Sequence, residues 1–146
     1  MNQPTYNVEY LPDEDHYIFE SIGKNGSIYK IIIFTEVQRG VFNFGFGDYD
    51  PKTYRINDKS VSDNGDMTKV LATVIGVMFS FLSENPFVSI LFKGSTPLRT
   101  QLYHRIINRY YEDINDSYDF FGFIENIPER FQKNKPYESF LIRKVF

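Results

Sequence analysis

The chain has 146 residues, a formal net charge of −3 at pH 7 and an apolar content of 42%, which suits one folded domain over residues 1–146. The acidic total argues against general DNA binding, because proteins that grip the duplex are usually basic. There is no cysteine and there are only two histidines. A disulfide scaffold, a thiolate metal site and a cysteine nucleophile are therefore excluded, and no metal site is predicted.

The N-terminal residues lack the basic and apolar regions of a secretory signal. The longest apolar stretch, near residues 70–82, is interrupted by Thr73, Gly76 and Ser80. It is shorter than the roughly 20 residues that a membrane-spanning helix needs. We therefore expect a cytoplasmic protein with no membrane segment.

The first part of the chain alternates strand-forming stretches with turn signals. Asn25-Gly26 separates two such stretches and is a typical hairpin turn. The expected elements are an arm or short edge strand at 1–14 and strands at 15–22, 28–37, 41–48 and 54–61.

The stretch at 41–48 alternates strictly between rings and smaller residues. One face carries Phe42, Phe44 and Phe46, and the other carries Asn43, Gly45 and Gly47. Glycines inside a strand often mark a close backbone approach. We expect a helix to pack closely on the glycine face, with a ligand or a second chain as the alternative occupants.

The second part of the chain has the apolar spacing of two long helices. The expected elements are helices at 67–83 and 97–112, strands at 87–92, 118–125 and 138–145, and a polar loop at 128–136. The order ββββ-α-β-α-ββ predicts an α+β domain with a largely antiparallel, twisted sheet and two main helices. The predicted core includes Phe44, Phe46, Val74, Ile75, Met78, Leu102 and Ile106.

Several aspartates surround the start of the first helix, and such clusters can bind Ca²⁺ or Mg²⁺. They are Asp48, Asp50, Asp58, Asp63 and Asp66. Their spacing fits no EF-hand loop. We expect them in turns, with Asp63 and Asp66 as helix caps favoured by the helix dipole.

The stretch at 93–109 carries the strongest functional signal, because an apolar strand runs directly into a helix start. Ser95 or Thr96 can cap this helix, and Pro97 suits its first turn. Unpaired backbone N–H groups at a helix start, with an arginine nearby, form a natural anion site. The predicted ligand-binding residues are Gly94, Ser95, Thr96, Arg99 and Arg105.

Arg99 is unfavourable for the bare helix dipole, so a negative group is expected close to it. The partner is either a ligand phosphate or an internal carboxylate such as Asp48, Asp50 or Asp66. We favour the internal carboxylate, because the chain is acidic. An ordinary capped helix start, with no ligand, is the other interpretation of the stretch.

Tyr103 lies on the same helix and can act as a general acid if it faces a pocket. An amphipathic tyrosine at the rim of the core is the alternative role. Its neighbour His104 points to another side of the helix and is expected on the surface.

Parts of the sequence resemble an uncharacterised family of small single-domain bacterial proteins. The resemblance rests on FGFGDYD (44–50), NGDMTKVLATV (64–74), GSTPLRTQLY (94–103) and the C-terminal residues 137–144. These segments cover most of the chain. The resemblance implies a single domain and carries no activity with it.

The order β-β-β-α-β-α-β-β also resembles the GNAT acyltransferases after their first two helices. Leu102 and Tyr103 stand where that fold has its Leu-Tyr pair, so this resemblance implies Tyr103 as the catalytic general acid and acetyl-CoA as the cofactor. The pyrophosphate loop of that family is rich in glycine with Gln or Arg. Residues 62–66 are acidic instead and would repel a pyrophosphate.

Three functions stay open at this point. The favoured one is a non-catalytic binding protein that takes a small anionic ligand or a protein partner, with a homodimer also open. The second is a GNAT-like acyl-CoA-dependent N-acyltransferase. The third is an RNA-binding or toxin-like module that uses Lys93, Arg99, Arg105 and Arg109 with nearby tyrosines.

Overall fold

The computed structural model describes residues 4–12, 16–57, 64–94 and 97–145, with only the backbone described at Leu98, Arg99 and Ile114. These residues form nine strands and two helices. In chain order the elements are β1 (Glu9–Leu11), β2 (His16–Gly23), β3 (Gly26–Gln38), β4 (Val41–Asp50), β5 (Arg55–Asn57), α1 (Met67–Glu84), β6 (Ser89–Phe92), α2 (Pro97–Ile114), β7 (Tyr118–Ile124), β8 (Ile127–Arg130) and β9 (Ser139–Lys144).

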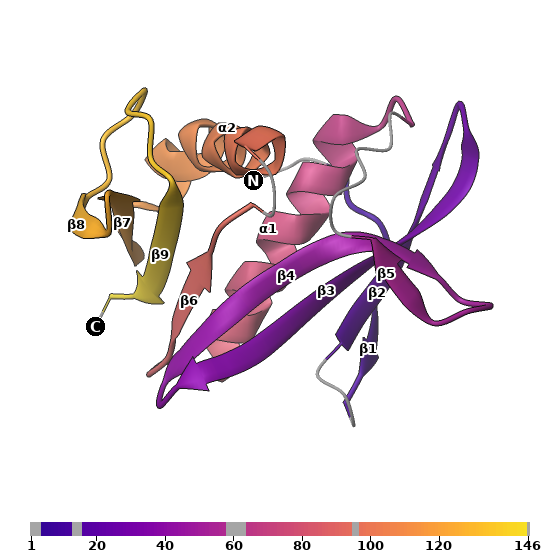
Figure 1. Ribbon diagram of the computed structural model, residues 1–146, viewed down its shortest axis with the longest axis horizontal. Coiled ribbons are helices and arrows are strands. Elements are labelled where there is room, and N and C mark those ends of the chain that lie inside the picture. Colours follow the sequence, from indigo (N-terminus) through magenta and orange to yellow (C-terminus); the bar gives the residue numbers. More distant parts are fainter. Residues whose placement is uncertain (1–3, 13–15, 58–63, 95–96, 146) are drawn as a thin grey trace.

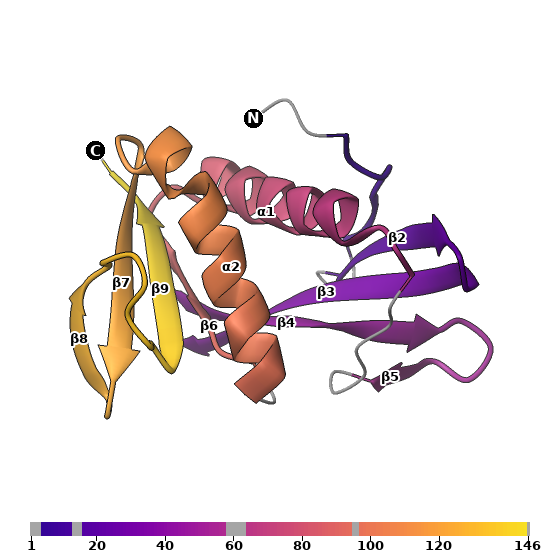
Figure 2. The same cartoon turned by 90° about the horizontal axis from the view of Figure 1, so that it is seen from above.

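The strands form one sheet in the order β1-β2-β3-β4-β6-β9-β7-β8, with β5 paired to β4. Among the described pairs only β4 and β6 run parallel, from Val41 opposite Ser89 to Phe44 opposite Phe92. Both helices lie on the same side of the sheet, and β7, β8 and β9 lie beside α2 (Figures 1 and 2). The α+β class and the largely antiparallel sheet are therefore confirmed.

The core consists of aromatic rings on the sheet and aliphatic side chains on the helices. Phe34 stacks on Phe81 of α1 with ring centroids 4.0 Å apart. Tyr103 of α2 packs edge-on against Phe44 and Phe92 at 5.7 and 5.6 Å. The predicted core residues are buried, with the exception of Leu102, which is partly buried against the core.

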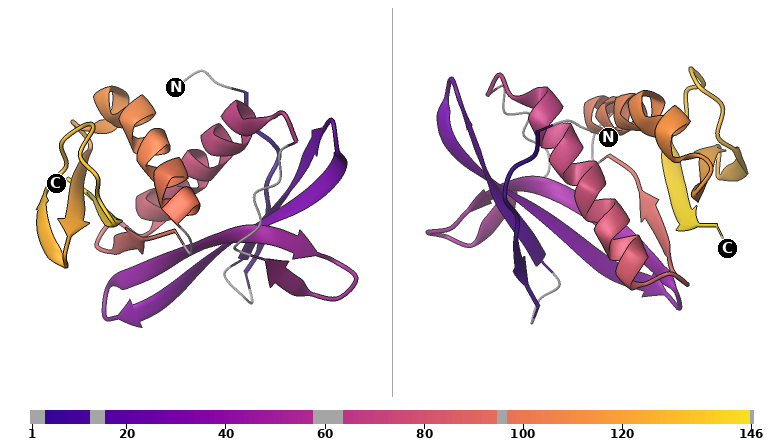
Figure 3. Two further views of the ribbon diagram at one scale, coloured as in Figure 1. Left: turned by 45° about the horizontal axis from the view of Figure 1, so that its top comes forward. Right: turned by 180° about the vertical axis from the view of Figure 1, so that it is seen from behind.

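The glycine face of β4 is not covered by a helix, so the expected helix packing is wrong. Both helices lie over the face that carries the rings (Figure 3). Burying three phenylalanines removes more apolar surface from water than covering glycines would. Gly45 and Gly47 instead line a pocket of about 340 Å³ on the opposite face, together with Ile31, Ile33 and Ile56.

One strand was missing from the sequence prediction. β8 (Ile127–Arg130) overlaps the stretch predicted as a polar loop at 128–136, and Pro128 within it argues against a strand. β8 is an edge strand that pairs only with β7, so a missing backbone N–H is tolerated there. The turn between β7 and β8 uses Glu125 and Asn126, which both have positive φ, as a two-residue hairpin turn requires. Of the strand predicted at 54–61, residues 55–57 form β5 and residues 58–61 lie outside the described part.

α1 corrects the expectation that the apolar stretch is too short to span a bilayer. Among the helices of the described residues, it alone is long and apolar enough to cross a membrane by length and composition. However, 56% of it is buried inside the protein. That burial is typical of the core helix of a soluble domain.

We predict opposite effects of alanine at two glycines. A Cβ at Gly122 would lie 2.3 Å from the ring of Tyr137, so Gly122→Ala should lower the free energy of unfolding by about 1–3 kcal/mol through overpacking. A Cβ at Gly76 in α1 would meet nothing within 4 Å, so Gly76→Ala should raise it by about 0.5–1 kcal/mol. Urea unfolding measures both variants, and a neutral Gly122→Ala would contradict the proposed ring contact.

Candidate functional site

The start of α2 forms one wall of the candidate site. β6 ends at Phe92, and the chain enters α2 at Pro97 after a short connection. The backbone N–H of Gly94 donates to Thr100 Oγ1 at 3.1 Å, which ties this connection to the first turns of the helix. Thr100 and His104 are four residues apart in α2, so their side chains lie on the same face of the helix.

The opposite wall is the loop at residues 131–138, which leads into β9. Tyr137 is only 4% exposed, and its ring rests on Gly122 of β7. Its hydroxyl donates to Glu129 Oε1 at 2.7 Å and accepts from the Gln132 N–H at 3.0 Å. Burial, together with the hydrogen bond to Glu129, raises the pKa of Tyr137 to about 12.

Lys135 fixes the same loop from outside. Its Nζ lies 2.5 Å from Glu129 Oε1. Two hydrogen bonds lower the pKa of Glu129 below its usual value: the one from Lys135 has the larger effect and the one from Tyr137 the smaller. The loop is thus held by contacts within the protein.

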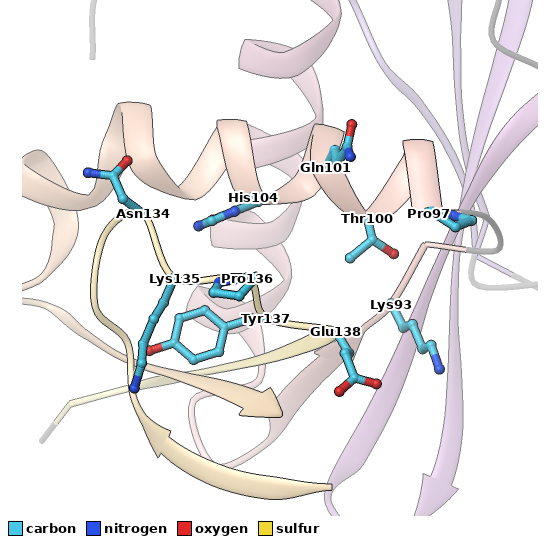
Figure 4. Close-up of a pocket in the computed structure, with 10 residues that line it drawn as sticks. All are labelled: Lys93, Pro97, Thr100, Gln101, His104, Asn134, Lys135, Pro136, Tyr137 and Glu138. Atoms are coloured by element: carbon cyan, nitrogen blue, oxygen red, sulfur yellow. The ribbon is translucent and has the colours of Figure 1, made fainter. Parts of the chain in front are cut away.

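A pocket of about 560 Å³ lies between these two walls, and we call it the α2 pocket (Figure 4). Lys93 and Glu138 lie at one end, Asn134 and Lys135 at the other, and His104 lies between the two ends. The described lining consists of Lys93, Pro97, Thr100, Gln101, His104, Asn134, Lys135, Pro136, Tyr137 and Glu138.

His104 is the inner polar group of the α2 pocket. Its imidazole ring lies 5.9–6.3 Å from the rings of Phe131, Tyr137 and Phe140. Its Nε2 atom is buried and has no hydrogen-bond partner in the structure. Burial among these rings lowers the pKa of His104, so the imidazole is neutral near pH 7.

The charges of the pocket lie at its ends. Figure 4 shows Lys93 and Glu138 at the same end, near the first turn of α2. Glu138 Oε1 accepts the N–H of Glu125 at 2.8 Å, which holds that carboxylate in place. The opposite charges of Lys93 and Glu138 limit how much negative charge a ligand can bring to this end.

The residues predicted for the anion site are only partly described. Gly94 is buried at the connection to α2, and Arg105 is exposed on the helix. Ser95 and Thr96 lie outside the described residues, as does the side chain of Arg99. Their predicted roles in ligand binding stay predictions.

Tyr103 lies in the core and is 5% exposed. It packs against Phe44 and Phe92 at the point where β4 and β6 stop pairing, since β4 continues to Asp50. It is not among the described residues that line the α2 pocket. Its catalytic role stays a prediction.

The sequence analysis missed two parts of the pocket lining, His104 and the loop at residues 131–138. His104 was expected on the surface, which is wrong, because α2 packs against the C-terminal strands as well as against the core. The 131–138 loop was predicted only as a polar connection. Its aromatic residues Phe131 and Tyr137 were the available signal, since both are large apolar side chains in a loop and both are buried.

A second polar cluster lies at the start of α1. The carboxylate of Asp66 accepts from the hydroxyls of Tyr6 and Ser21, both at 2.5 Å, and makes no cap hydrogen bond to the helix, contrary to expectation. Burial and the bond to Asp66 raise the pKa of Tyr6. Asn64 donates to Ser21 Oγ and to the Gly26 carbonyl, both at 3.0 Å. These contacts anchor the β2–β3 hairpin and the N-terminal segment to α1.

Of the other aspartates in the predicted cluster, Asp48 and Asp50 also make contacts within the protein. Asp48 pairs with the buried Lys30 at 2.5 Å, and Asp50 accepts the Lys52 N–H at 2.9 Å within a turn. Asp58 and Asp63 lie outside the described residues. Across the described part of the chain, no three histidine or carboxylate side chains are grouped as a metal site.

The fold and the site define a small α+β protein with a pocket between its second helix and its C-terminal strands. The chain belongs to a family of unknown function, DUF6934, whose family model matches residues 2–145. This match confirms the resemblance to an uncharacterised family of small single-domain proteins. No curated protein and no solved structure matches the chain.

We predict that His104 makes stability depend on pH. Because burial lowers its folded-state pKa below the unfolded value of about 6.5, the stability it contributes is present above that value. That stability is lost as the pH falls through the folded-state pKa. Between roughly pH 7 and pH 5 the free energy of unfolding should fall less in His104→Gln than in the parent protein. Denaturant unfolding at each pH tests this, with Gln101→Ala, an exposed and non-titrating residue of the same helix, as the control that should keep the parent's pH dependence.

Proposed function

We propose that the protein binds a small anionic ligand in the α2 pocket. The observation that carries the proposal is a pocket that opens beside the start of a long helix and has Lys93 in its lining. Its volume of about 560 Å³ falls within the range of small-molecule sites.

Electrostatics favours a negative group at the Lys93 end. The first backbone N–H groups of a helix have no partner inside the helix, and the helix dipole adds positive potential there. Lys93 contributes a full charge at the same end.

Glu138 restricts the charge of the ligand. Its carboxylate lies at the Lys93 end and would repel a second negative charge more than a first. A ligand with one negative charge is therefore favoured over a dianion. The protein is proposed as a binding protein, and no reaction is assigned to it.

Two charge substitutions with opposite effects test the proposal. Lys93→Gln should weaken acetate and inorganic phosphate binding about five-fold, because a hydrogen bond to a charged group contributes about 1 kcal/mol or more. Glu138→Gln should tighten both, and its amide oxygen can still accept the Glu125 N–H. Isothermal titration calorimetry on the full chain measures the affinities.

The control is Lys52→Gln, which removes one positive charge from the distant turn between β4 and β5. Its affinities should match those of the parent protein. If neither anion binds the parent protein, or if Lys93→Gln and Glu138→Gln behave like the control, the proposed function is wrong.

A GNAT-like N-acyltransferase is a second candidate. The element order β4, α1, β6, α2, β7 agrees with the order that the resemblance rests on. Tyr103 also contacts both β4 and β6 where the two strands separate, through Phe44 and Phe92. These observations support a shared topology. The acidic residues before α1 stand against a pyrophosphate site.

For this candidate we predict that acetyl-CoA at millimolar concentration raises the melting temperature, and that Tyr103→Phe reduces acetyl transfer to amines while leaving the fold intact. The phenylalanine keeps the ring contacts with Phe44 and Phe92 and removes only the hydroxyl. Thermal unfolding with and without acetyl-CoA is the first measurement. The absence of any shift would remove the acyltransferase candidate and would leave the binding proposal untouched.

A further inference from the structure

The side of the sheet that faces away from the helices is apolar, although an antiparallel sheet with one solvated face normally carries polar side chains there. Both helices lie on the other side (Figures 2 and 3). We call the side without helices the open face. Its central side chains are half-buried, and each alternates along its strand with a residue of the core: Ile18, Ile33, Leu91, Phe121 and Leu141.

Three exposed apolar side chains extend the open face. Ile22 and Tyr29, 62% and 38% exposed, continue the outward rows of β2 and β3. Ile56 of β5 is 45% exposed and lies opposite Tyr49 of the outward row of β4. Single exposed apolar residues are ordinary, but an apolar surface that extends over several strands marks an interaction site.

The middle of the open face is hollow. Gly45 and Gly47 have no side chains, and they line the pocket of about 340 Å³ together with Asn43. Leu91 of β6 lies next to this pocket, because it is opposite Asn43 in the register. A projecting side chain and a hollow on one face are complementary when a second copy packs on it by two-fold symmetry.

The β1–β2 end of the open face is negatively charged. Glu9 lies opposite Ile18 in the register, and Glu20 is two residues further along β2. Residues that are opposite in the register share one face, as do alternate residues of a strand. Both carboxylates therefore belong to the open face.

The β7–β8–β9 end of the open face is positively charged. The guanidinium groups of Arg130 and Arg143 lie 5.5 and 5.0 Å from the centre of the Phe121 ring. Both pair with the single carboxylate of Asp119, at 3.2 and 3.4 Å. Two positive charges and one negative charge leave this end positive.

The edges of the sheet are poor sites for adding a strand. β1 has three residues, and β8 has four and contains Pro128, which has no backbone N–H to donate. Association through the open face is favoured over association through an edge.

We propose that the protein forms a homodimer in which the open faces of two copies pack together around a two-fold axis near β4 and β6. The axis places the negative β1–β2 end of each copy over the positive β7–β8–β9 end of the other. The alternative two-fold arrangement would place like charges together. In the proposed arrangement, Leu91 of each copy faces the glycine hollow of the other.

The size of the open face suits a reversible dimer. The main order of the sheet contains eight strands, which span about 38 Å at about 4.8 Å per strand, and about five residues of a strand cover about 17 Å. The footprint is roughly 600 Å² per copy, or roughly 1,200 Å² in total, which is the lower limit of stable specific interfaces. We expect a micromolar dissociation constant.

Sedimentation velocity of the full chain from about 1 μM to about 1 mM measures this dissociation constant. Asn43 is exposed at the centre of the open face, so Asn43→Arg adds a charge there without removing a core contact. It should weaken the dimer at least about 100-fold, because the interface would bury two unpaired charges. Asn115→Arg makes the same change at an exposed position after α2 and should leave the dimer unchanged. Circular dichroism checks the fold, and Thr35→Arg, at the exposed neighbour of Asn43, replaces Asn43→Arg if that variant unfolds.

Charge reversal at the two ends tests the orientation. Glu9→Arg and Arg130→Glu should each weaken the homodimer about ten-fold, because each contact occurs twice in a two-fold dimer. A mixture of these two variants should form a heterodimer as tight as the parent dimer, because both pairs of facing charges are then opposite.

The outcomes bear on separate parts of the proposal. A parent protein that stays monomeric over the whole concentration range overturns the dimer. A dimer that persists in the folded arginine variant shows that the open face is not the interface, and a mixture that forms no heterodimer rejects the orientation. The α2 pocket lies on the helix side of the sheet, so Asn43→Arg should bind acetate and phosphate as the parent protein does.

Discussion

The parallel pairing of β4 with β6 is the constraint on which the rest of the structure depends. It joins the N-terminal strands to the C-terminal strands through only four residue pairs, from Val41–Ser89 to Phe44–Phe92. Parallel neighbours cannot be connected by a tight turn, so the chain leaves the sheet and returns through α1. The chain then leaves β6 at Phe92 and enters α2 on the same side of the sheet (Figure 2). The position of the α2 pocket follows from that second departure.

α2 packs against two parts of the protein, the core and the C-terminal strands, through the neighbouring side chains Tyr103 and His104. Tyr103 packs into the core between Phe44 and Phe92, whereas His104, rotated by about 100° on the helix, faces the rings beside β9. The loop across the pocket is fixed by the Tyr137 ring on Gly122. Both walls of the pocket are therefore built by packing within the protein.

The sequence predicted those parts of the fold whose local pattern is strong. α1, α2 and the long strands β2, β3 and β4 follow from periodicity. The candidate anion site at the start of α2 was predicted from the unpaired N–H groups of a helix start, and it stays a prediction. The other wall was not predictable in this way. The role of Tyr137 depends on a glycine fifteen residues earlier in the chain, and no local pattern connects them. His104 was misplaced because α2 was treated as having a single buried face.

The polar side chains of Lys135 and Tyr137 in the 131–138 loop have hydrogen-bond partners within the protein, whereas His104 Nε2 across the pocket has none. Glu129 accepts from Tyr137 and pairs with Lys135, so neither a ligand nor an ordered loop movement is needed to complete these contacts. His104 Nε2 is the described atom of the pocket lining that stays buried without a partner. Under the proposed function, the charge that a ligand can carry depends on Lys93 and Glu138, which lie together at one end of the pocket.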